Sequence, residues 1–119
     1  MAKEILVVDD QPGICLLLTD ILENEGYIVY TANTGKQALD KVTEHLFDLI
    51  ILDYKLPILD GTKVLQRMEA AEIHIPAILM SGLAEDIIKE AEHYSSVKNV
   101  LPKPFNVMDV CNIVKSIIG

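Results

Sequence analysis

Short uninterrupted runs of apolar residues alternate along this chain with longer stretches in which apolar residues recur every three or four positions. The clearest run is Leu49 to Leu52, which stops at Asp53. A run of this kind is typical of a strand buried on both faces, whereas the wider spacing is typical of an amphipathic helix. The pattern predicts strands at residues 4–8, 27–32, 49–52, 77–80 and 97–101.

A helix is predicted after each strand. The first begins near Pro12 and ends at Gly26, the second is capped by Asn33 or Thr34, the third follows Asp60-Gly61 and the last is capped by Asn106. The fourth, around Ile87, has a weaker pattern. The residues expected to face the core are Ile14, Leu17, Leu18, Ile21 and Leu22; Ala38, Leu39, Val42 and Leu46; Val64, Leu65, Met68 and Ala71; Ile87, Ile88 and Ala91; and Val107, Val110, Cys111, Val114, Ile117 and Ile118.

This regular alternation predicts one α/β domain spanning residues 1–119, with a parallel sheet covered by helices on both faces and right-handed crossovers. A flavodoxin-like (βα)5 doubly wound fold, with strand order 2-1-3-4-5, fits the pattern, although periodicity alone does not prove the order. That order places strands 1 and 3 side by side at the switch point, where open α/β sheets bind ligands.

The composition narrows the function. The formal charge is −8, from 10 basic and 18 acidic residues. This balance argues against nucleic acid as a partner and suits cations or basic protein surfaces. The chain contains no apolar run of about 18 residues, as a membrane span would need, and its start lacks the regions of a signal peptide. We therefore expect a cytoplasmic protein with no membrane partner.

Cysteine and histidine residues do not suggest a further site. Cys15 and Cys111 fall in helical patterns without metal-type spacing, so we expect buried, reduced thiols rather than a disulfide. His45, His74 and His93 lie in or after helices and are expected at the surface.

Polar residues with distinct chemistry follow four of the predicted strands: Asp9 and Asp10, Asp53, Ser81 and Lys103. Each alone could be a helix cap or a surface charge, but the predicted fold brings all of them to one edge of the sheet. Two carboxylates 4 Å apart repel by about 4 kcal/mol at an effective dielectric constant of 20, so a hard cation such as Mg²⁺ would stabilise the group. Lysine and a hydroxyl suit phosphoryl oxygens, and a carboxylate can become an aspartyl phosphate.

These features together resemble the response-regulator receiver domain. The resemblance rests on the VDD pair, the Asp that closes the third strand, the hydroxyl after the fourth and the Lys-Pro after the fifth, and it covers essentially the whole chain. Within the family, the stretches VDDQPGI, ILDYKLPILDG and LPKPF are most similar to the single-domain regulators of sporulation phosphorelays.

The resemblance implies a metal site. Asp10 and Asp53 would bind Mg²⁺ through their carboxylates, Asp9 mostly through water, and Lys55 through its backbone carbonyl. Mn²⁺ or Ca²⁺ could take the place of Mg²⁺ in a crystal.

It also implies the phosphoryl chemistry. Asp53 would be the phosphoacceptor, Ser81 and Lys103 would bind the phosphoryl oxygens, and Lys103-Pro104 would be a cis peptide. The sequence departs from the family at Val100, where an aromatic residue or His often acts as a switch, so helix 4 and its loops are expected to report phosphorylation in another way. Gly82 after Ser81 is a milder departure, because the hydroxyl remains.

A docking surface is expected beside this site. Leu16 lies on the face of the first helix that points away from its core stripe, next to Gln11, Pro12 and Gly13. The resemblance implies that a histidine kinase and a histidine phosphotransferase dock there, with a regulatory phosphatase as a further candidate partner. The expected surface also includes Leu83, Pro104 and Phe105.

The favoured function is therefore a phosphorelay intermediate without independent enzymatic turnover, acting in sporulation initiation. Since no effector domain follows Gly119, output is expected through phosphotransfer or protein contact. One alternative is a chemotaxis-type receiver that acts by binding its target. Another is a metal-dependent phosphatase, which usually needs a second acid two residues after its nucleophile, where this chain has Lys55.

Overall fold

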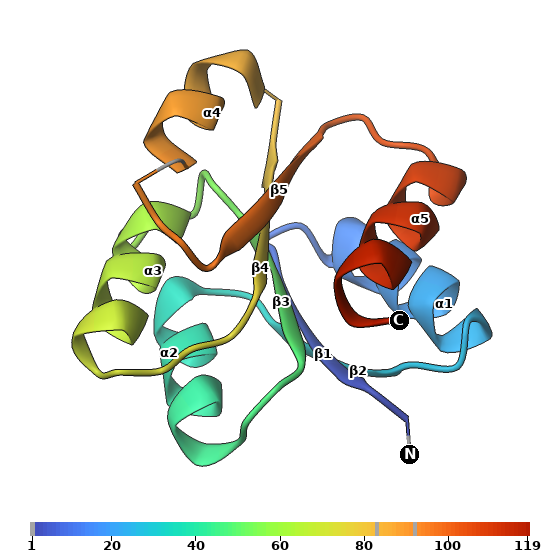
Figure 1. The fold of residues 1–119 in the computed structure, drawn as a ribbon, viewed down its shortest axis with the longest axis horizontal. Helices are drawn as coiled ribbons and strands as arrows, with labels where there is room; N and C mark the ends of the chain where they lie inside the picture. Colours follow the sequence, from blue (N-terminus) through green and yellow to red (C-terminus); the bar gives the residue numbers. More distant parts are fainter. Residues whose placement is uncertain (1, 83, 92) are drawn as a thin grey trace.

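The computed structural model describes residues 2–82, 84–91 and 93–119, apart from the side chains of residues 84–87. Strands and helices alternate from one end of the chain to the other (Figure 1). In order they are β1 (Glu4–Val8), α1 (Pro12–Asn24), β2 (Ile28–Ala32), α2 (Gly35–Glu44), β3 (Leu49–Asp53), α3 (Gly61–Ala70), β4 (Ala77–Ser81), α4 (Ala84–Ala91), β5 (Val97–Pro102) and α5 (Val107–Ile118).

The strands form one parallel sheet in the order β2-β1-β3-β4-β5, which confirms the predicted topology. The helices α2, α3 and α4 cover one face, and α1 and α5 cover the other (Figure 1). Because all connections are parallel crossovers, the carboxyl ends of the strands meet at one edge of the sheet. The polar residues that follow the strands are therefore brought together.

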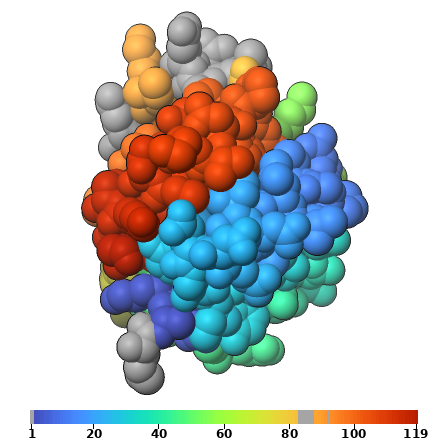
Figure 2. All heavy atoms as spheres, turned by 90° about the vertical axis from the view of Figure 1, so that its right-hand side faces the viewer, coloured from blue at the N-terminus to red at the C-terminus, as the bar shows by residue number. Residues whose placement is uncertain are grey.

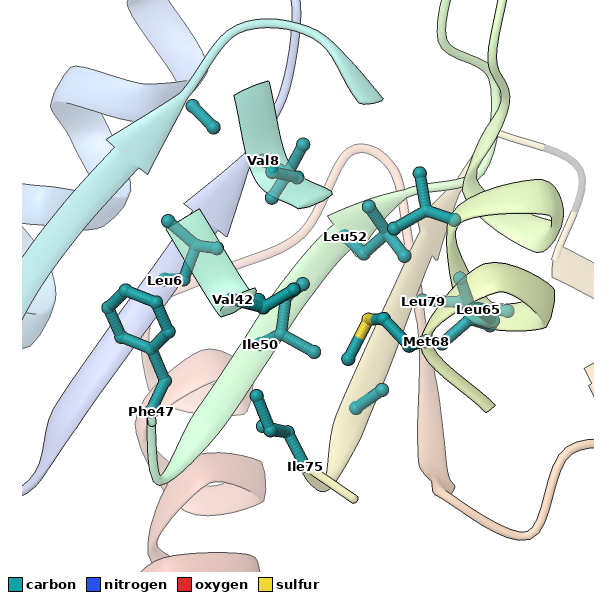
Figure 3. Close-up of a cluster of buried hydrophobic side chains, with 14 of the residues drawn as sticks. Leu6, Val8, Val42, Phe47, Ile50, Leu52, Leu65, Met68, Ile75 and Leu79 are labelled. Atoms are coloured by element: carbon teal, nitrogen blue, oxygen red, sulfur yellow. The ribbon is translucent and has the colours of Figure 1, made fainter. Parts of the chain in front are cut away.

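The two faces of the sheet bury separate apolar clusters, because successive side chains of a strand point to opposite faces. Leu6, Ile50 and Leu52 pack with α2 and α3 in the cluster shown in Figure 3. Ile5 and Ile51 pack with α1 and α5 on the other side. Every residue of β3 is buried, and its first four residues, Leu49 to Leu52, are all apolar.

Short polar side chains set the starts of the helices. Thr34, rather than Asn33, caps α2, with its hydroxyl oxygen accepting a hydrogen bond from the Gln37 N–H. Asp60 and Asn106 cap α3 and α5 in the same way. Pro12 occupies the first turn of α1, as predicted, where its missing N–H leaves no intrahelical bond unmade.

Several residues predicted to face the core are exposed instead. They are Leu17, Leu46, Ala71, Ile88 and Val107. Leu46 is 74% exposed because α2 ends at Glu44 and the extended backbone at His45 breaks the helical spacing. Ala71 lies at the C-cap of α3, and Val107 is the first residue of α5, so neither has a full helical turn holding it against the sheet.

The cysteines follow expectation, since Cys15 and Cys111 are buried and free. His74 and His93 are exposed. His45 is less exposed than predicted, because its ring packs against Tyr30 and Phe47. Among the residues that the structure describes, no helix is long and apolar enough to span a bilayer.

Candidate functional site

Three carboxylates lie together at the carboxyl edge of the sheet. Asp9 follows β1, Asp53 ends β3, and the two strands are neighbours through the pairing of Val8 with Leu52. Oxygen atoms of Asp9, Asp10 and Asp53 all lie within 4.8 Å of one another. Asp9 and Asp53 are buried, whereas Asp10 is exposed. The cluster combines a dense negative charge with one open side.

Lys103 supplies the compensating charge. Its Nζ lies 2.7 Å from Oδ2 of Asp9 and 3.4 Å from Oδ1 of Asp53. Its backbone N–H donates to the carbonyl oxygen of Ser81 at 2.8 Å, which ties the segment after β5 to the end of β4. A buried carboxylate without a partner is very costly, so this lysine is needed for the cluster to exist without a cation.

The protonation equilibria reflect this crowding. Burial, together with the negative charge of Asp9, raises the pKa of Asp53, and Lys103 only partly offsets the rise. For Lys103, burial acts to lower the pKa, but the hydrogen bond to Asp9 and the charges of Asp53 and Asp9 outweigh it and raise the pKa. Lys103 therefore stays charged, while the ionised form of Asp53 is disfavoured.

The carboxylates are held by their surroundings. The Gln11 N–H donates to Oδ1 of Asp9 at 2.9 Å, and the Cys15 thiol donates to the Asp9 carbonyl oxygen at 3.4 Å. On the other strand, a Cβ added at Gly61 would lie 2.5 Å from the carbonyl oxygen of Asp53. The start of α3 therefore presses directly against the backbone of Asp53, and only glycine fits there.

A cavity of about 500 Å³ opens over the cluster. Its lining includes Asp10, Asp53, Lys55, Pro57, Gly82 and Lys103. An all-oxygen ligand set on an open cavity suits a hard divalent cation such as Mg²⁺, which retains several waters and binds one or two carboxylates. The chain's own donor set therefore fits such an ion.

The structure brings together most of the residues singled out from the sequence. Ser81 is buried at the end of β4, next to β3. Lys103-Pro104 is a cis peptide, as predicted. The exposed side chain of Leu16, at 65%, also agrees with the prediction. Leu83 lies outside the described residues.

The expected docking surface borders a second cavity. This cavity, of about 360 Å³, is lined by Gln11, Ile14, Leu17, Lys103, Pro104 and Phe105. Gln11 and Lys103 line both cavities, so the two lie side by side. Pro12 and Gly13 are exposed in the first turn of α1. Leu17 was predicted to face the core, but it lines this cavity instead, because the apolar stripe of α1 is wider than the face that the sheet covers.

Comparison with known proteins agrees with the resemblance seen in the sequence. The sequence model described as "Response regulator receiver domain" matches residues 5–115. The chain is 39% identical over 116 residues to sporulation initiation phosphotransferase F of Bacillus subtilis, covering 97% of this chain and 93% of that protein. It is 36% identical to the alkaline phosphatase synthesis transcriptional regulatory protein PhoP of Bacillus subtilis, but spans only 49% of that relative.

Solved structures resemble the whole fold. The response regulator TrrA of Thermotoga maritima, determined in complex with Mg²⁺ and BeF, matches with a TM-score of 0.86 at 31% identity, covering 97% of this chain and 98% of that one. The chemotaxis protein CheY4 of Vibrio cholerae matches with a TM-score of 0.88 at 26% identity, covering 98% and 99% of the two chains.

Proposed function

Because the chain belongs to the response regulator receiver domain family, we propose that it accepts a phosphoryl group from a phosphohistidine on Asp53 and passes it to a histidine of another protein. The observation that carries this proposal is the position of Lys103, which lies within 3.4 Å of both Asp9 and Asp53 in a buried carboxylate cluster. A fixed positive charge beside a buried carboxylate suits the stabilisation of a phosphoryl group on that carboxylate.

In this mechanism a carboxylate oxygen of Asp53 attacks phosphorus. The new P–O bond forms as the P–N bond to the donor imidazole breaks, and the bonding electron pair stays on the ring nitrogen. Lys103 would turn its Nζ toward the phosphoryl oxygens, and the Ser81 hydroxyl would donate to another of them. The phosphoryl group adds negative charge to an already acidic site, and the positive charge of Lys103 would offset part of it.

A bound Mg²⁺ would neutralise negative charge on the carboxylates and the incoming phosphoryl oxygens. We propose that Asp10 and Asp53 bind it through their carboxylates, that Asp9 acts mostly through water, and that the Lys55 carbonyl completes the protein ligands. The oxygen-only donor set and the open cavity support this choice of ion.

The role in a sporulation phosphorelay is supported by similarity along most of the length of sporulation initiation phosphotransferase F. We infer that a sensor histidine kinase and a histidine phosphotransferase dock over the second cavity, beside Leu16, Pro104 and Phe105. A regulatory phosphatase would reach the acyl phosphate by the same approach. The apolar character of this surface and its position beside the site support the assignment.

Reconstituted transfer tests the function. The wild-type chain, mixed with a phosphorylated histidine kinase from its own genome, should gain the phosphoryl group and then lose it to a histidine phosphotransferase. A chemotaxis-type receiver would accept the phosphoryl group but not pass it on. A phosphatase would instead hydrolyse a phosphomonoester with steady turnover, and that result would refute the proposal.

A further inference from the structure

The loop between β3 and α3 contains a strained turn at Ile58. The backbone φ of Ile58 is +68°, and the Leu59 N–H donates to the Pro57 carbonyl oxygen at 2.7 Å. A hydrogen bond across three residues with a positive central φ is the rare and strained form of the γ-turn. A β-branched residue at positive φ is an outlier, because its Cβ crowds the backbone.

Tight packing on both sides of the loop holds the turn in place. A Cβ on Gly35 would lie 2.5 Å from the carbonyl oxygen of Leu59, so α2 packs directly against the backbone after the turn. The Gly61 N–H donates to the Tyr54 carbonyl oxygen at 2.8 Å, which closes the loop at its base. The turn is therefore imposed by its surroundings, as a strained conformation must be in order to persist.

No packing of the Ile58 side chain within its own chain offsets this strain. It is 104% exposed, so it buries no apolar area within its own chain. Glycine would adopt the same φ without strain, and asparagine would do so more easily than isoleucine. Both the backbone conformation and the exposed side chain thus disfavour isoleucine at this position in the isolated protein.

The turn lies on the rim of the proposed phosphoryl site. Pro57, which directly precedes Ile58, and Lys55, three residues before it, line the cavity over Asp53. Figure 2 shows the light-green tip of this loop projecting at the same end of the molecule as the blue start of α1 and the orange segment after β5. A protein that places a histidine against Asp53 must cover this rim.

We propose that Ile58 is a docking contact for the histidine-bearing protein that exchanges a phosphoryl group with Asp53. Its side chain would insert into an apolar recess of that partner, held in position by the rigid turn. The exposed positive charge of Lys55, in the same loop, fits a recess bordered by acidic residues. The inference rests on the proposed function and adds a contact in the loop between β3 and α3, outside the second cavity that Pro104 and Phe105 line.

The test compares protein and small-molecule donors. For Ile58→Gly we expect phosphorylation by phosphoramidate at the wild-type rate, since the reacting groups are untouched. Transfer from the phosphorylated histidine kinases and phosphotransferases of its own genome should fall about tenfold in kcat/KM, as expected for one buried aliphatic contact. The melting temperature should rise by about 2 to 4 °C as the strain is relieved.

Two matched variants control for the two properties of Ile58. Glu72→Gly relieves a similar positive φ, +59°, at the far end of α3, and Leu46→Ala removes another exposed leucine-sized side chain away from the site. Both should transfer at the wild-type rate. A third variant, Ile58→Val, keeps both the strain and an apolar side chain, and should retain most of the transfer rate.

Several results would overturn the inference. Equal transfer by wild type and Ile58→Gly from every active donor would mean that the partner does not contact Ile58. If phosphorylation of Ile58→Gly by phosphoramidate slowed to the same extent, the substitution would be acting on the reacting groups. A melting temperature of Ile58→Gly at or below that of the wild type would show that Ile58 is not strained. Self-association of the wild type that is lost in Ile58→Gly would assign the contact to a second copy. A wild type that phosphoramidate fails to label would instead refute the proposed function itself.

Discussion

Replacing Asp53 with asparagine should make the metal-free protein more stable at neutral pH. At an effective dielectric constant of 20, an ionised Asp9 within 4.8 Å of Asp53 repels it by about 3.5 kcal/mol. Lys103, at 3.4 Å, attracts Asp53 by about 5 kcal/mol on the same scale. The exposed Asp10 adds a smaller, screened repulsion, so the charge interactions nearly cancel and the burial of Asp53 decides the balance.

Burial favours the neutral side chain, which agrees with the raised pKa of Asp53. Asparagine has nearly the same shape and still offers an oxygen to Lys103. We therefore expect Asp53→Asn to raise the free energy of unfolding by about 1 kcal/mol at pH 7 without metal, or about 4 °C in melting temperature. Such a gain on removing a functional group is the usual sign of a site whose activity opposes stability.

The pH dependence of the free energy of unfolding tests the same effect of Asp53 independently. The folded pKa of Asp53 lies above its ordinary value of 3.8, so its contribution to stability is fully present below that value and is lost as pH rises through the folded pKa. The free energies of unfolding of Asp53→Asn and the wild type should therefore be equal near pH 3.8, and the variant should become the more stable protein as the pH rises towards neutrality.

Urea unfolding of both proteins in EDTA, at several pH values, measures this difference. Mg²⁺ at ten times its Kd should then add about 1.4 kcal/mol to the wild type and much less to the variant. An Asp53→Asn protein that is less stable than the wild type at pH 7 in EDTA would refute the reasoning, because the charged side chain would then be stabilising.

Three further substitutions test other parts of the structure. Gly61→Ala should lower the free energy of unfolding by about 2 to 3 kcal/mol, because its Cβ would meet the Asp53 carbonyl oxygen, and wild-type urea stability would contradict that contact. Leu16→Ala should slow transfer from a protein donor while stability changes by less than about 0.5 kcal/mol, and unchanged transfer would remove Leu16 from the docking surface. Lys55→Ala should shorten the lifetime of the acyl phosphate by admitting water, as followed by loss of label, and an unchanged lifetime would exclude shielding by Lys55.

Much of the fold could be predicted because the buried strands consist of continuous apolar residues. The apolar runs of β3 and β1, Leu49 to Leu52 and Ile5 to Val8, have no polar positions, since both faces of the central sheet are covered. Helix ends were predicted less well. Leu46 keeps the helical spacing of α2, but the helix stops two residues earlier, and local spacing carries no information about that stop.

The identity of the clustered residues could also be predicted, since the ends of parallel strands share one edge. The sequence placed Lys103 at this edge but could not predict that its Nζ would pair with both Asp9 and Asp53, because this depends on the path of the backbone after β5. Nor could it predict the turn at Ile58, which is set by the packing of Gly35 and Gly61 against distant backbone atoms. Contacts of this kind exist only in the folded chain.

The central claim is that Asp53 receives a phosphoryl group, and the mass of the intact protein tests it most directly. After incubation with acetyl phosphate and Mg²⁺, the wild type should gain about 80 Da, as expected for one phosphoryl group on a carboxylate. The gain should be absent in Asp53→Asn and when EDTA replaces Mg²⁺. A wild type that gains no mass, or an Asp53→Asn protein that gains as much, would contradict the account.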